Sequence, residues 1–386
     1  MAYHVVIIGG GIVGCATAVH LLRADPGLRV VIVEPDFGYR LAATPRASGG
    51  VRQLFSCPEN IALSQYTLEV IGRWHDFAGG DAADLGWRPQ GYLFVAGPGA
   101  ASASLAANLE VQRAHGVRAE WLEPGELADR FGLLATSGLR GAVLSPSDGW
   151  LDPSALLAGM RGAARRQSAR LLRDRAVGFS VSASRIRSVA LESGRQLAAD
   201  AVVNAAGCWA PALAAQAGMP VPVEPMRRLE HQVETPATVD GLPFVKDPAG
   251  LAVRPQGTGL SVGLVDFGQP GGFDLSIDHS YFDRVVWPAL VHRFPGLDEL
   301  RLRSTTAGLY DQNRMDGNMI IGNWPGHLDN FYLACGFSGH GLMHAPGIGR
   351  ALSELILHGE YQTIDLTRLG YQRVQDGRAY PEAGIR

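Results

Sequence analysis

An α/β fold built on a parallel sheet is predicted by three features of the sequence. The run His4–Ile8 is almost entirely β-branched, which is typical of a strand buried on both faces of a parallel sheet. A glycine-rich turn, a helical stretch ending near Arg23 and a second apolar run at 30–33 follow it, the order of a β-α-β unit. Short strand-like runs separated by Ser-rich and Ser-Gly turns then occupy 171–207.

Length and composition exclude several classes of protein. With 386 residues the chain is about two to three times the size of a typical domain of roughly 150 residues. Its 46 % hydrophobic and 18 % charged residues exclude a disordered chain. A net charge of −3 and a pI near 6.4 give no electrostatic reason to expect binding to nucleic acid or an anionic membrane. Four glycines interrupt the apolar stretch 5–22, which therefore predicts a strand, a turn and a helix rather than a membrane span.

The cysteines give no sign of a metal site, a redox motif or a disulfide framework. None of the four lies at a short spacing from another: Cys15, Cys57, Cys208 and Cys335. The first four residues lack the basic region of a signal peptide. We therefore expect a soluble, cytoplasmic protein without a metal.

The segment 9–14 reads G-G-G-I-V-G and fits the dinucleotide-binding pattern G-x-G-x-x-G. Gly9 permits the turn, Gly11 lets backbone N–H groups reach a pyrophosphate, and Gly14 lets helix and strand pack closely. Glu34 follows the second strand, 20 residues after Gly14, where an acid accepts hydrogen bonds from an adenosine ribose. The acid argues against a 2′-phosphate, so FAD and NAD both remain open at this point.

The next two segments favour FAD and add a core helix. In the loop 43–52, small residues surround two glycines and two arginines, so the backbone can wrap closely around a cofactor. The segment Ser56–Glu59 predicts a capping box with proline in the first turn of a helix. That helix is closed by Gly79-Gly80, and its apolar stripe predicts core: Leu63, Tyr66, Val70, Trp74 and Phe77.

Two later strand ends also carry small residues. The strand ending at 204 runs into Asn-Ala-Ala-Gly207, and the strand 331–335 runs into the loop 336–346 before a helix that stops at Gly359. Each could bring backbone N–H groups to a cofactor. His340 and His344 have the i,i+4 spacing of helical metal ligands, but no acid or cysteine cluster lies near them, so a metal is not expected.

At this point the sequence resembles a known family, the D-amino-acid-oxidase-type FAD-dependent amine oxidoreductases, which include sarcosine oxidase and glycine oxidase. The similarity is nearly continuous, and by motif it is strongest with the branch of FAD-dependent oxidoreductase domain-containing protein 1. The matching stretches are GGGIVG at 9–14, ASGGVRQLFSCPEN at 47–60, NAAG at 204–207, AGLYDQNRMDGNMIIG at 307–322 and GFSGHGLMHAPGIGRA at 336–351.

The resemblance implies a Rossmann-like FAD-binding domain of the glutathione-reductase type and a smaller substrate domain with a mixed sheet. The FAD-binding domain would be discontinuous and would comprise 1–84, 145–220 and 306–386. The substrate domain would comprise 85–144 and 221–305. Its second segment contains strand-like runs at 223–234, 251–254 and 260–265 and a helix near 281–293.

The family reaction implies a chemical role for several residues. A hydride moves from the carbon beside an amine nitrogen to flavin N5, and water hydrolyses the resulting imine. The backbone of 339–343 would lie at the flavin edge that gains negative charge, and Arg52 would lie beside the flavin ring. The residues assigned to catalysis are Arg52, Tyr310, His340 and Met343.

A larger set is implied to surround non-covalent FAD. It consists of Gly9, Gly11, Ile12, Val13, Gly14, Glu34, Pro35, Ser48, Gly49, Gly50, Val51, Arg52, Val177, Ala206, Gly207, Trp209, Gly308, Gly336, Gly339, His340, Gly341, Leu342 and Met343.

The sequence departs from the family pattern where a flavin is attached covalently and where a substrate is bound. Gly308 stands where sarcosine oxidase has its flavin-linked cysteine, and Ser261 aligns with the lysine that promotes its oxygen reaction. Phe55 and Met343 replace its carboxylate-binding arginine and lysine, and Tyr310 replaces the carboxylate arginine of glycine oxidase. The candidate substrate ligands that remain are Arg227, Arg228, Arg254, Ser261 and His344.

The sequence leaves alternatives open for the electron acceptor and for the class of function. Lys246, the only lysine, lies far from Ser261 in sequence, and Arg52 is the only nearby cation that the motifs supply. A dehydrogenase of a small amine, with a quinone or flavoprotein as electron acceptor, is therefore expected before an oxidase that uses O2. The rival classes are an NAD-dependent dehydrogenase and a non-catalytic, assembly-factor-like flavoprotein.

Overall fold

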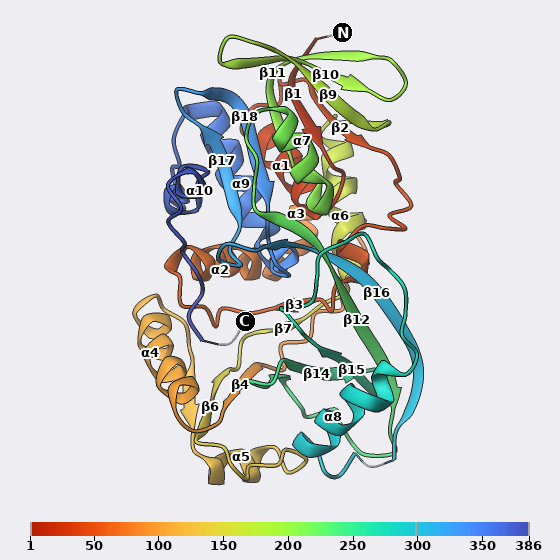
Figure 1. The fold of residues 1–386 in the computed structure, drawn as a ribbon, viewed down its shortest axis with the longest axis vertical. Coiled ribbons are helices and arrows are strands. Elements are labelled where there is room, and N and C mark those ends of the chain that lie inside the picture. The colour runs from red at the N-terminus through yellow and green to blue at the C-terminus, as the bar shows by residue number, and fades with distance from the viewer. Residues whose placement is uncertain (1, 298, 385–386) are drawn as a thin grey trace.

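Two eight-stranded sheets carry most strands of the computed structural model, which describes residues 2–297 and 299–384 (Figure 1). The first sheet runs in the order β17-β18-β11-β1-β2-β8, and β10 and β9 extend it beside β11. Its strands are β1 (Ala2–Ile8), β2 (Val30–Glu34), β8 (Arg170–Arg173), β9 (Ala176–Ser182), β10 (Arg185–Leu191), β11 (Gln196–Asn204), β17 (Ile320–Trp324) and β18 (Leu328–Cys335).

The second sheet lies in the lower half of Figure 1 and has the order β16-β12-β15-β14-β13-β4-β6-β5. Its strands are β4 (Tyr92–Ala96), β5 (Glu120–Leu122), β6 (Gly141–Ser145), β12 (Val223–Glu234), β13 (Phe244–Lys246), β14 (Leu251–Gln256), β15 (Gly259–Leu264) and β16 (Arg301–Asn313). A two-stranded sheet of β3 (Gly50–Val51) and β7 (Gly149–Trp150) accompanies them. The predicted α/β class with a second, mixed sheet is confirmed.

The helices pack mainly against the faces of these sheets. The α-helices are α1 (Ile12–Ala24), α2 (Pro58–Gly72), α3 (Trp74–Ala78), α4 (Ala100–Ala114), α5 (Pro124–Arg130), α6 (Pro153–Arg166), α7 (Ala210–Gln216), α8 (Trp287–Arg293), α9 (Gly341–His358) and α10 (Gln372–Gln375). Short 3-10 helices are η1 (Thr44–Arg46), η2 (Gly207–Trp209) and η4 (Thr367–Leu369), and η3 (Phe282–Val286) is π-helical.

The centre of the first sheet is buried on both faces, as the apolar run at its start predicts. Val5 and Ile7 belong to the core beneath α1 and α9, whereas Val6 and Ile8 belong to the core shared with α7 and the β9–β10 meander. Successive side chains of a strand point to opposite faces, so both faces demand apolar residues. The strand β1 pairs in parallel with β2 and β11, and β11 pairs in parallel with β18. The carboxyl ends of these four strands therefore meet at one edge.

Two sequence predictions about the helices need correction. The predicted capping box does not form, because Cys57 is the N-cap of α2 and the hydroxyl of Ser56 donates to Glu382 at 2.6 Å. The single helix predicted to end at Gly79 is two helices, α2 and α3, since the backbone leaves helical geometry at Arg73. The predicted stripe is nevertheless buried throughout. The helix predicted near 281–293 also divides, into η3 and α8.

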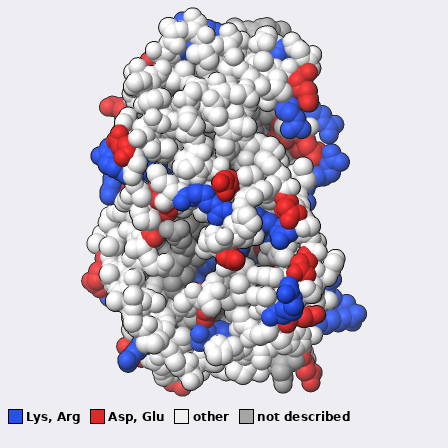
Figure 2. Space-filling view, in the orientation of Figure 1, with Lys and Arg blue, Asp and Glu red and all other residues white. Residues whose placement is uncertain are grey.

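Surface features are plain on the face drawn in Figure 2. Basic and acidic side chains are interspersed there, and the surface is hollowed between the upper and lower halves. Within the described residues, no helix combines the length and the apolar character that crossing a membrane requires.

Close packing of α1 against α9 predicts a large effect for one small substitution. A Cβ at Gly349 would lie 2.5 Å from the carbonyl carbon of Ala16, so Gly349→Ala must push the two helices apart. Overpacking of this kind costs about 1–3 kcal/mol, which we expect to appear as a lower free energy of unfolding in urea. Gly72→Ala is the matched control, because nothing lies within 4 Å of its Cβ position. Equal stability of the two variants would contradict the packing argument.

Candidate active site

A tight glycine turn connects β1 to α1 at the edge where the parallel strands end. Gly9 has φ +104°, and a Cβ there would lie 2.3 Å from the carbonyl oxygen of Ala205. A Cβ at Gly14 would lie 2.0 Å from the carbonyl oxygen of Gly9. In contrast, the nearest atom to a Cβ at Gly11 is Thr44 Oγ1 at 3.8 Å. Neighbouring backbone therefore fills the space beside Gly9 and Gly14, whereas the space beside Gly11 is free. This free space lies at the N-terminus of α1, where backbone N–H groups favour a pyrophosphate.

Glu34 closes the same turn from the end of β2. Its Oε2 accepts the N–H of Gly10 at 2.9 Å, and its Oε1 accepts the N–H of Asp36 at 2.8 Å. Partial burial raises the pKa of Glu34. A carboxylate has about four lone-pair sites, so Glu34 keeps acceptor capacity for a ribose hydroxyl. The donors and the open space fit an adenosine pyrophosphate.

The next strand end brings the other predicted cofactor residues to this edge. The N–H of Ala205 donates to the carbonyl oxygen of Ile8 at 2.8 Å, which places Ala206 and Gly207 beside the glycine turn. Gly207 has φ +54° and no atom within 4 Å of a Cβ position. Val177, on β9, is 44 % exposed.

The loop after β18 is held in a left-handed conformation by a buried acid that the sequence analysis missed. Gly336, Ser338 and Gly339 have φ +74°, +52° and +99°. Asp311 Oδ2 accepts the N–H groups of Gly336 at 2.8 Å and Phe337 at 3.2 Å. Burial raises the pKa of Asp311 to about 6. Asp311 follows Tyr310 in the strand motif, which is the signal that could have pointed to it.

Arg52 lies beside the start of α9. It is 2 % exposed, and its Nη2 is 3.1 Å from Nε2 of His340, the N-cap of α9. Its guanidinium carbon lies 3.9 Å from the centre of the Phe55 ring, and it also donates to the carbonyl oxygen of Leu54. Burial lowers the pKa of Arg52. The site therefore contains a buried cation that packs on an aromatic ring.

Tyr310 links this group to the second sheet. A Cβ at Gly339 would lie 2.5 Å from its ring, so only glycine fits there, and Arg228 Cζ is 5.1 Å from the ring centre. Gly339 immediately precedes His340, the residue that contacts Arg52. The structure thus brings Arg52, Tyr310, Arg228 and the Gly339 backbone together around one space.

Met343 and His344 lie in the first turns of α9. They are 6 % and 0 % exposed. The His344 ring lies 5.0 Å from Phe55, and burial lowers its pKa to about 3, so it is neutral at ordinary pH. Among the residues described, neither ring nitrogen of His344 has a hydrogen-bond partner. His340 and His344 have ring centres 5.8 Å apart, and no cluster of three or more metal-ligating side chains occurs in the described part of the chain.

Three candidate substrate ligands form hydrogen bonds or an ion pair with other residues of the protein. Arg227 forms an ion pair with Asp274, and its Nη1 donates to Ser276. Arg254 Nε donates to the carbonyl oxygen of Ser48 at 2.8 Å, so it braces the cofactor loop. The hydroxyl of Ser261 donates to Glu230.

Lys246 corrects a second expectation. It is remote from Ser261 in sequence, yet the charges of both Arg52 and Arg228 act on it. Burial and these two cations lower the pKa of Lys246 to about 7. Lys246 pairs across the sheet with Phe94, and Arg52 Cζ lies 5.0 Å from the centre of the Phe94 ring, so Lys246 is a second cation near Arg52. The slow reaction with oxygen stays a prediction.

The loop 47–51 passes closely beneath the second sheet. Gly49 has φ +80°, and a Cβ there would lie 2.0 Å from the carbonyl oxygen of Leu151. A Cβ at Gly50 would lie 2.8 Å from the Tyr92 hydroxyl, and one at Gly308 would lie 3.2 Å from Arg46 Cβ. At each of these glycines a neighbouring segment therefore approaches too closely for a side chain to fit without displacement.

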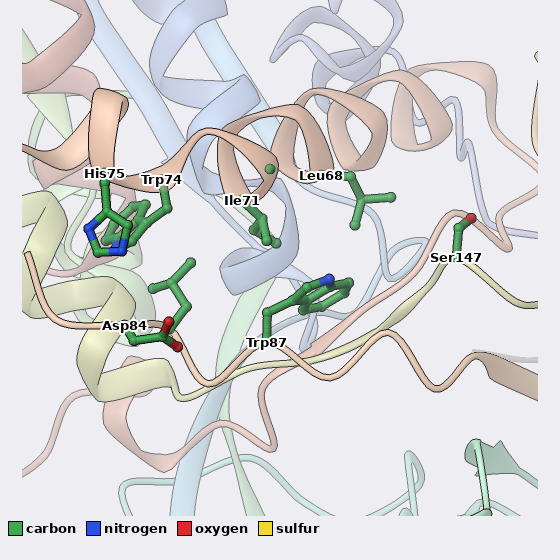
Figure 3. Close-up of a pocket in the computed structure, with 9 residues that line it drawn as sticks. Leu68, Ile71, Trp74, His75, Asp84, Trp87 and Ser147 are labelled. Atoms are coloured by element: carbon green, nitrogen blue, oxygen red, sulfur yellow. The ribbon is translucent and has the colours of Figure 1, made fainter. Parts of the chain in front are cut away.

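Two surface cavities lie near these elements. One, of about 710 Å³, lies between the loop 45–47 and the second sheet, and Trp150, Glu230 and Arg254 are among the residues that line it. The other, of about 340 Å³, lies beside α2 and α3 and is drawn in Figure 3 with Leu68, Ile71, Trp74, His75, Asp84, Trp87 and Ser147 labelled. The second cavity contains none of the predicted site residues.

Comparison with known proteins supports the cofactor assignment. Residues 4–355 match the DAO family, described as FAD dependent oxidoreductase. FAD-dependent oxidoreductase domain-containing protein 1 from Bos taurus is 32 % identical over 98 % of this chain and 86 % of that protein. Mitochondrial sarcosine dehydrogenase from Mus musculus is 29 % identical over 92 % of this chain and 40 % of that protein. The crystal structure of L-proline dehydrogenase from P. horikoshii has a TM-score of 0.88 and 26 % identity, covering 98 % of this chain and 99 % of that one.

The glycine turn predicts two distinct ways to lose FAD. Gly11→Val fills the only open side of the turn, so we expect purified apoprotein. Glu34→Ala removes one charged acceptor for a ribose hydroxyl, a hydrogen bond that contributes on the order of 1.5–3 kcal/mol, so affinity should fall roughly tenfold to a hundredfold. FAD content and the dissociation constant from flavin fluorescence measure both effects. Glu69→Ala, at an exposed carboxylate, is the control, and wild-type occupancy in Gly11→Val and Glu34→Ala would refute the assignment.

Asp311 predicts a pH dependence of stability. Its pKa is about 6 in the folded chain against an ordinary value of 3.8, so the folded state binds the proton more tightly. Stability contributed by that proton is present at low pH and is lost as the pH rises from about 4 to about 6. Asp311→Asn keeps a carbonyl acceptor for the loop without a charge. We expect its free energy of unfolding, relative to wild type, to increase between pH 4 and pH 7 in urea titrations, and a pH-independent difference would count against this account.

Proposed function

We propose that this chain, which belongs to the DAO family of FAD-dependent oxidoreductases, oxidises the C–N bond of a small amine or amino acid. The observation that carries the proposal is the convergence of Arg52, Tyr310 and the Gly339 backbone at the start of α9. Two similar enzymes, sarcosine dehydrogenase and L-proline dehydrogenase, are named for substrates that are both secondary amines. An N-methyl or cyclic amino acid is therefore the favoured substrate.

The proposed chemistry divides between the cofactor and the protein. When bound, FAD supplies a two-electron oxidation in which a hydride leaves the carbon beside the amine nitrogen for flavin N5, and the nitrogen lone pair completes the imine. The N–H groups that begin the 18-residue helix α9 stabilise the negative charge that develops at the ring edge. The guanidinium of Arg52 adds a fixed positive charge in a site sheltered from water. Water then hydrolyses the imine to a carbonyl compound and an amine.

The proposed division of labour follows the two sheets except at β16, a strand of the second sheet that lies mostly within 306–386. The segments 1–84, 145–220 and 306–386 would hold FAD through the glycine turn, Glu34, the loop 47–51 and the start of α9. The segments 85–144 and 221–305 would form the opposite wall, which contacts the substrate. FAD is proposed to be non-covalent because Gly308 offers no nucleophile. The electron acceptor that follows, a quinone, a flavoprotein or O2, would receive the two electrons in a second half-reaction, with the cytoplasm as the proposed compartment.

Anaerobic flavin reduction tests this function. We expect sarcosine or L-proline to bleach the visible flavin absorbance of the purified holoenzyme. Arg52→Met should slow the reduction by roughly a hundredfold to a thousandfold, the usual effect of losing one charge-stabilising group. Arg187→Met, which removes an exposed arginine on β10, is the matched control.

The contrary outcomes are distinct. If no amine in a broad panel of secondary amines and amino acids reduces the flavin, while dithionite does, the chain is a non-catalytic flavoprotein. FAD content is measured in each variant first, so that a loss of cofactor is not mistaken for a loss of chemistry. Reoxidation by air at the rate of a dedicated oxidase would assign O2 as the acceptor.

A further inference from the structure

The inner face of the second sheet, which faces the loop 47–51, contains an open row of small residues between two cations. The register pairs Gly263 of β15 with Ala252 of β14, and Ala252 with Lys246 of β13, so these three positions lie in one row on one face. Arg228 reaches over this row from β12, since a Cβ at Gly263 would lie 3.9 Å from its Nη2. Glycine and alanine therefore leave a shallow floor, with a guanidinium at one end and an ammonium at the other.

The cations at this floor are not neutralised by the protein. In the described part of the chain, the half-buried side chain of Lys246 has no ion pair or hydrogen bond, and the charges that act on it come from Arg52 and Arg228. Arg228 Nε is buried and lacks a hydrogen-bond partner among the same residues, and its Nη1 makes one long contact of 3.4 Å with Leu264 O. Buried charges and donors without partners are costly. An anion at this floor would satisfy both groups.

The neighbouring acids are occupied elsewhere. Glu230, which pairs with Gly263 in the same row, accepts the hydroxyl of Ser261 and acts on Arg254. Asp148 accepts the backbone and side-chain N–H groups of Gln53, both at 2.7 Å. Neither acid forms an ion pair with Arg228 or Lys246 in the described structure. The missing negative charge must therefore come from a ligand.

We propose that Arg228 and Lys246 bind the carboxylate of the substrate on the inner face of the second sheet; this rests on the proposed amine oxidation. A carboxylate is planar and offers about four lone-pair sites, enough for one guanidinium and one ammonium. The opposite wall offers no cation at Phe55 or Met343. The anionic end of the substrate therefore lies against β12 and β13, and its amine points toward the start of α9. Arg227, the adjacent arginine, does not contribute, because its side chain points to the other face and pairs with Asp274.

This arrangement makes anion affinity depend on pH near neutrality. The groups that face Lys246 are Arg52, Arg228, the apolar ring of Phe94 and the small side chain of Ala252. Since the pKa of Lys246 is about 7 in the empty site, binding of a carboxylate is accompanied by proton uptake above that pH. Affinity should then fall by up to about tenfold per pH unit.

The test uses the FAD-loaded enzyme and a carboxylate that cannot be oxidised. Cyclopentanecarboxylate has no amine, and cyclopentanecarboxamide is its neutral isostere; both are titrated by calorimetry and by the change in flavin absorbance. We expect the carboxylate to bind and the carboxamide to bind at least tenfold more weakly. Lys246→Met and Arg228→Met should each weaken carboxylate binding by roughly tenfold to a hundredfold.

Two further variants make the result specific. Lys246→Arg keeps the charge and should retain most of the affinity, but it should abolish the loss of affinity between pH 7 and pH 9. Arg227→Met removes an equal charge from the neighbouring position on the other face and should bind the carboxylate as the wild type does. Equal binding of carboxylate and carboxamide would overturn the proposal, as would wild-type affinity in both Lys246→Met and Arg228→Met.

Failure of this proposal is separable from failure of the proposed function. Carboxylate binding requires no turnover, so it is measured even when no amine reduces the flavin. If amines reduce the flavin but both methionine variants bind the carboxylate normally, the anion site is wrong and the oxidation stands. If the variants lose carboxylate binding but no amine reduces the flavin, the anion site stands and the oxidation is wrong.

Discussion

Contact between backbone and backbone at the end of β1 is the constraint on which the rest of the site depends. The Cβ positions of Gly9 and Gly14 lie only 2.3 Å and 2.0 Å from carbonyl oxygens, so any side chain there would move α1 away from the sheet. With the turn closed, the carbonyl oxygen of Gly10 accepts the Tyr39 hydroxyl at 2.9 Å, and the N–H of Gly10 reaches Glu34. Because Gly9 and Gly14 have no side chains, the helix N-terminus can lie this close to the sheet, and its position determines where a pyrophosphate would bind.

A second constraint joins the two sheets. The strand β16 pairs with β12 over most of its length, and Asp311 near its end holds the loop that precedes α9 through two N–H groups. Burying this carboxylate is unfavourable, as its raised pKa shows, but the hydrogen bonds offset part of that cost. Tyr310, the preceding residue, thereby lies against Gly339. The wall assigned to the substrate and the loop assigned to the cofactor are consequently parts of one rigid unit.

Features that depend on neighbours in sequence were predictable, and those that depend on distant partners were not. The strand β12 has the predicted bounds because strand periodicity and turn residues are local signals. The capping box failed because Ser56 binds Glu382, 326 residues away. Alternation implies that Arg227 and Arg228 point to opposite faces, but only the placed sheet shows which one faces the inner side. Lys246 was dismissed by its distance along the chain, although parallel pairing of β13 with β4 returns it to the neighbourhood of Arg52. The roles of the site residues remain predictions.

Two other arginines of this protein are buried and paired with acids, in contrast to Arg228 and Lys246. Arg293 pairs with Asp247 at 2.6 Å, and Arg373 pairs with Asp316 at 3.1 Å, all with side chains no more than 10 % exposed. A buried charge without a partner costs roughly several kcal/mol, and these two pairs avoid that cost. Lys246 and Arg228 are half-buried and form no ion pair in the described part of the chain, beside small residues and near Arg52. Because the chain has other acids within the same sheet and directs them elsewhere, the positive charge at this floor is explained by a negative charge that arrives with the substrate.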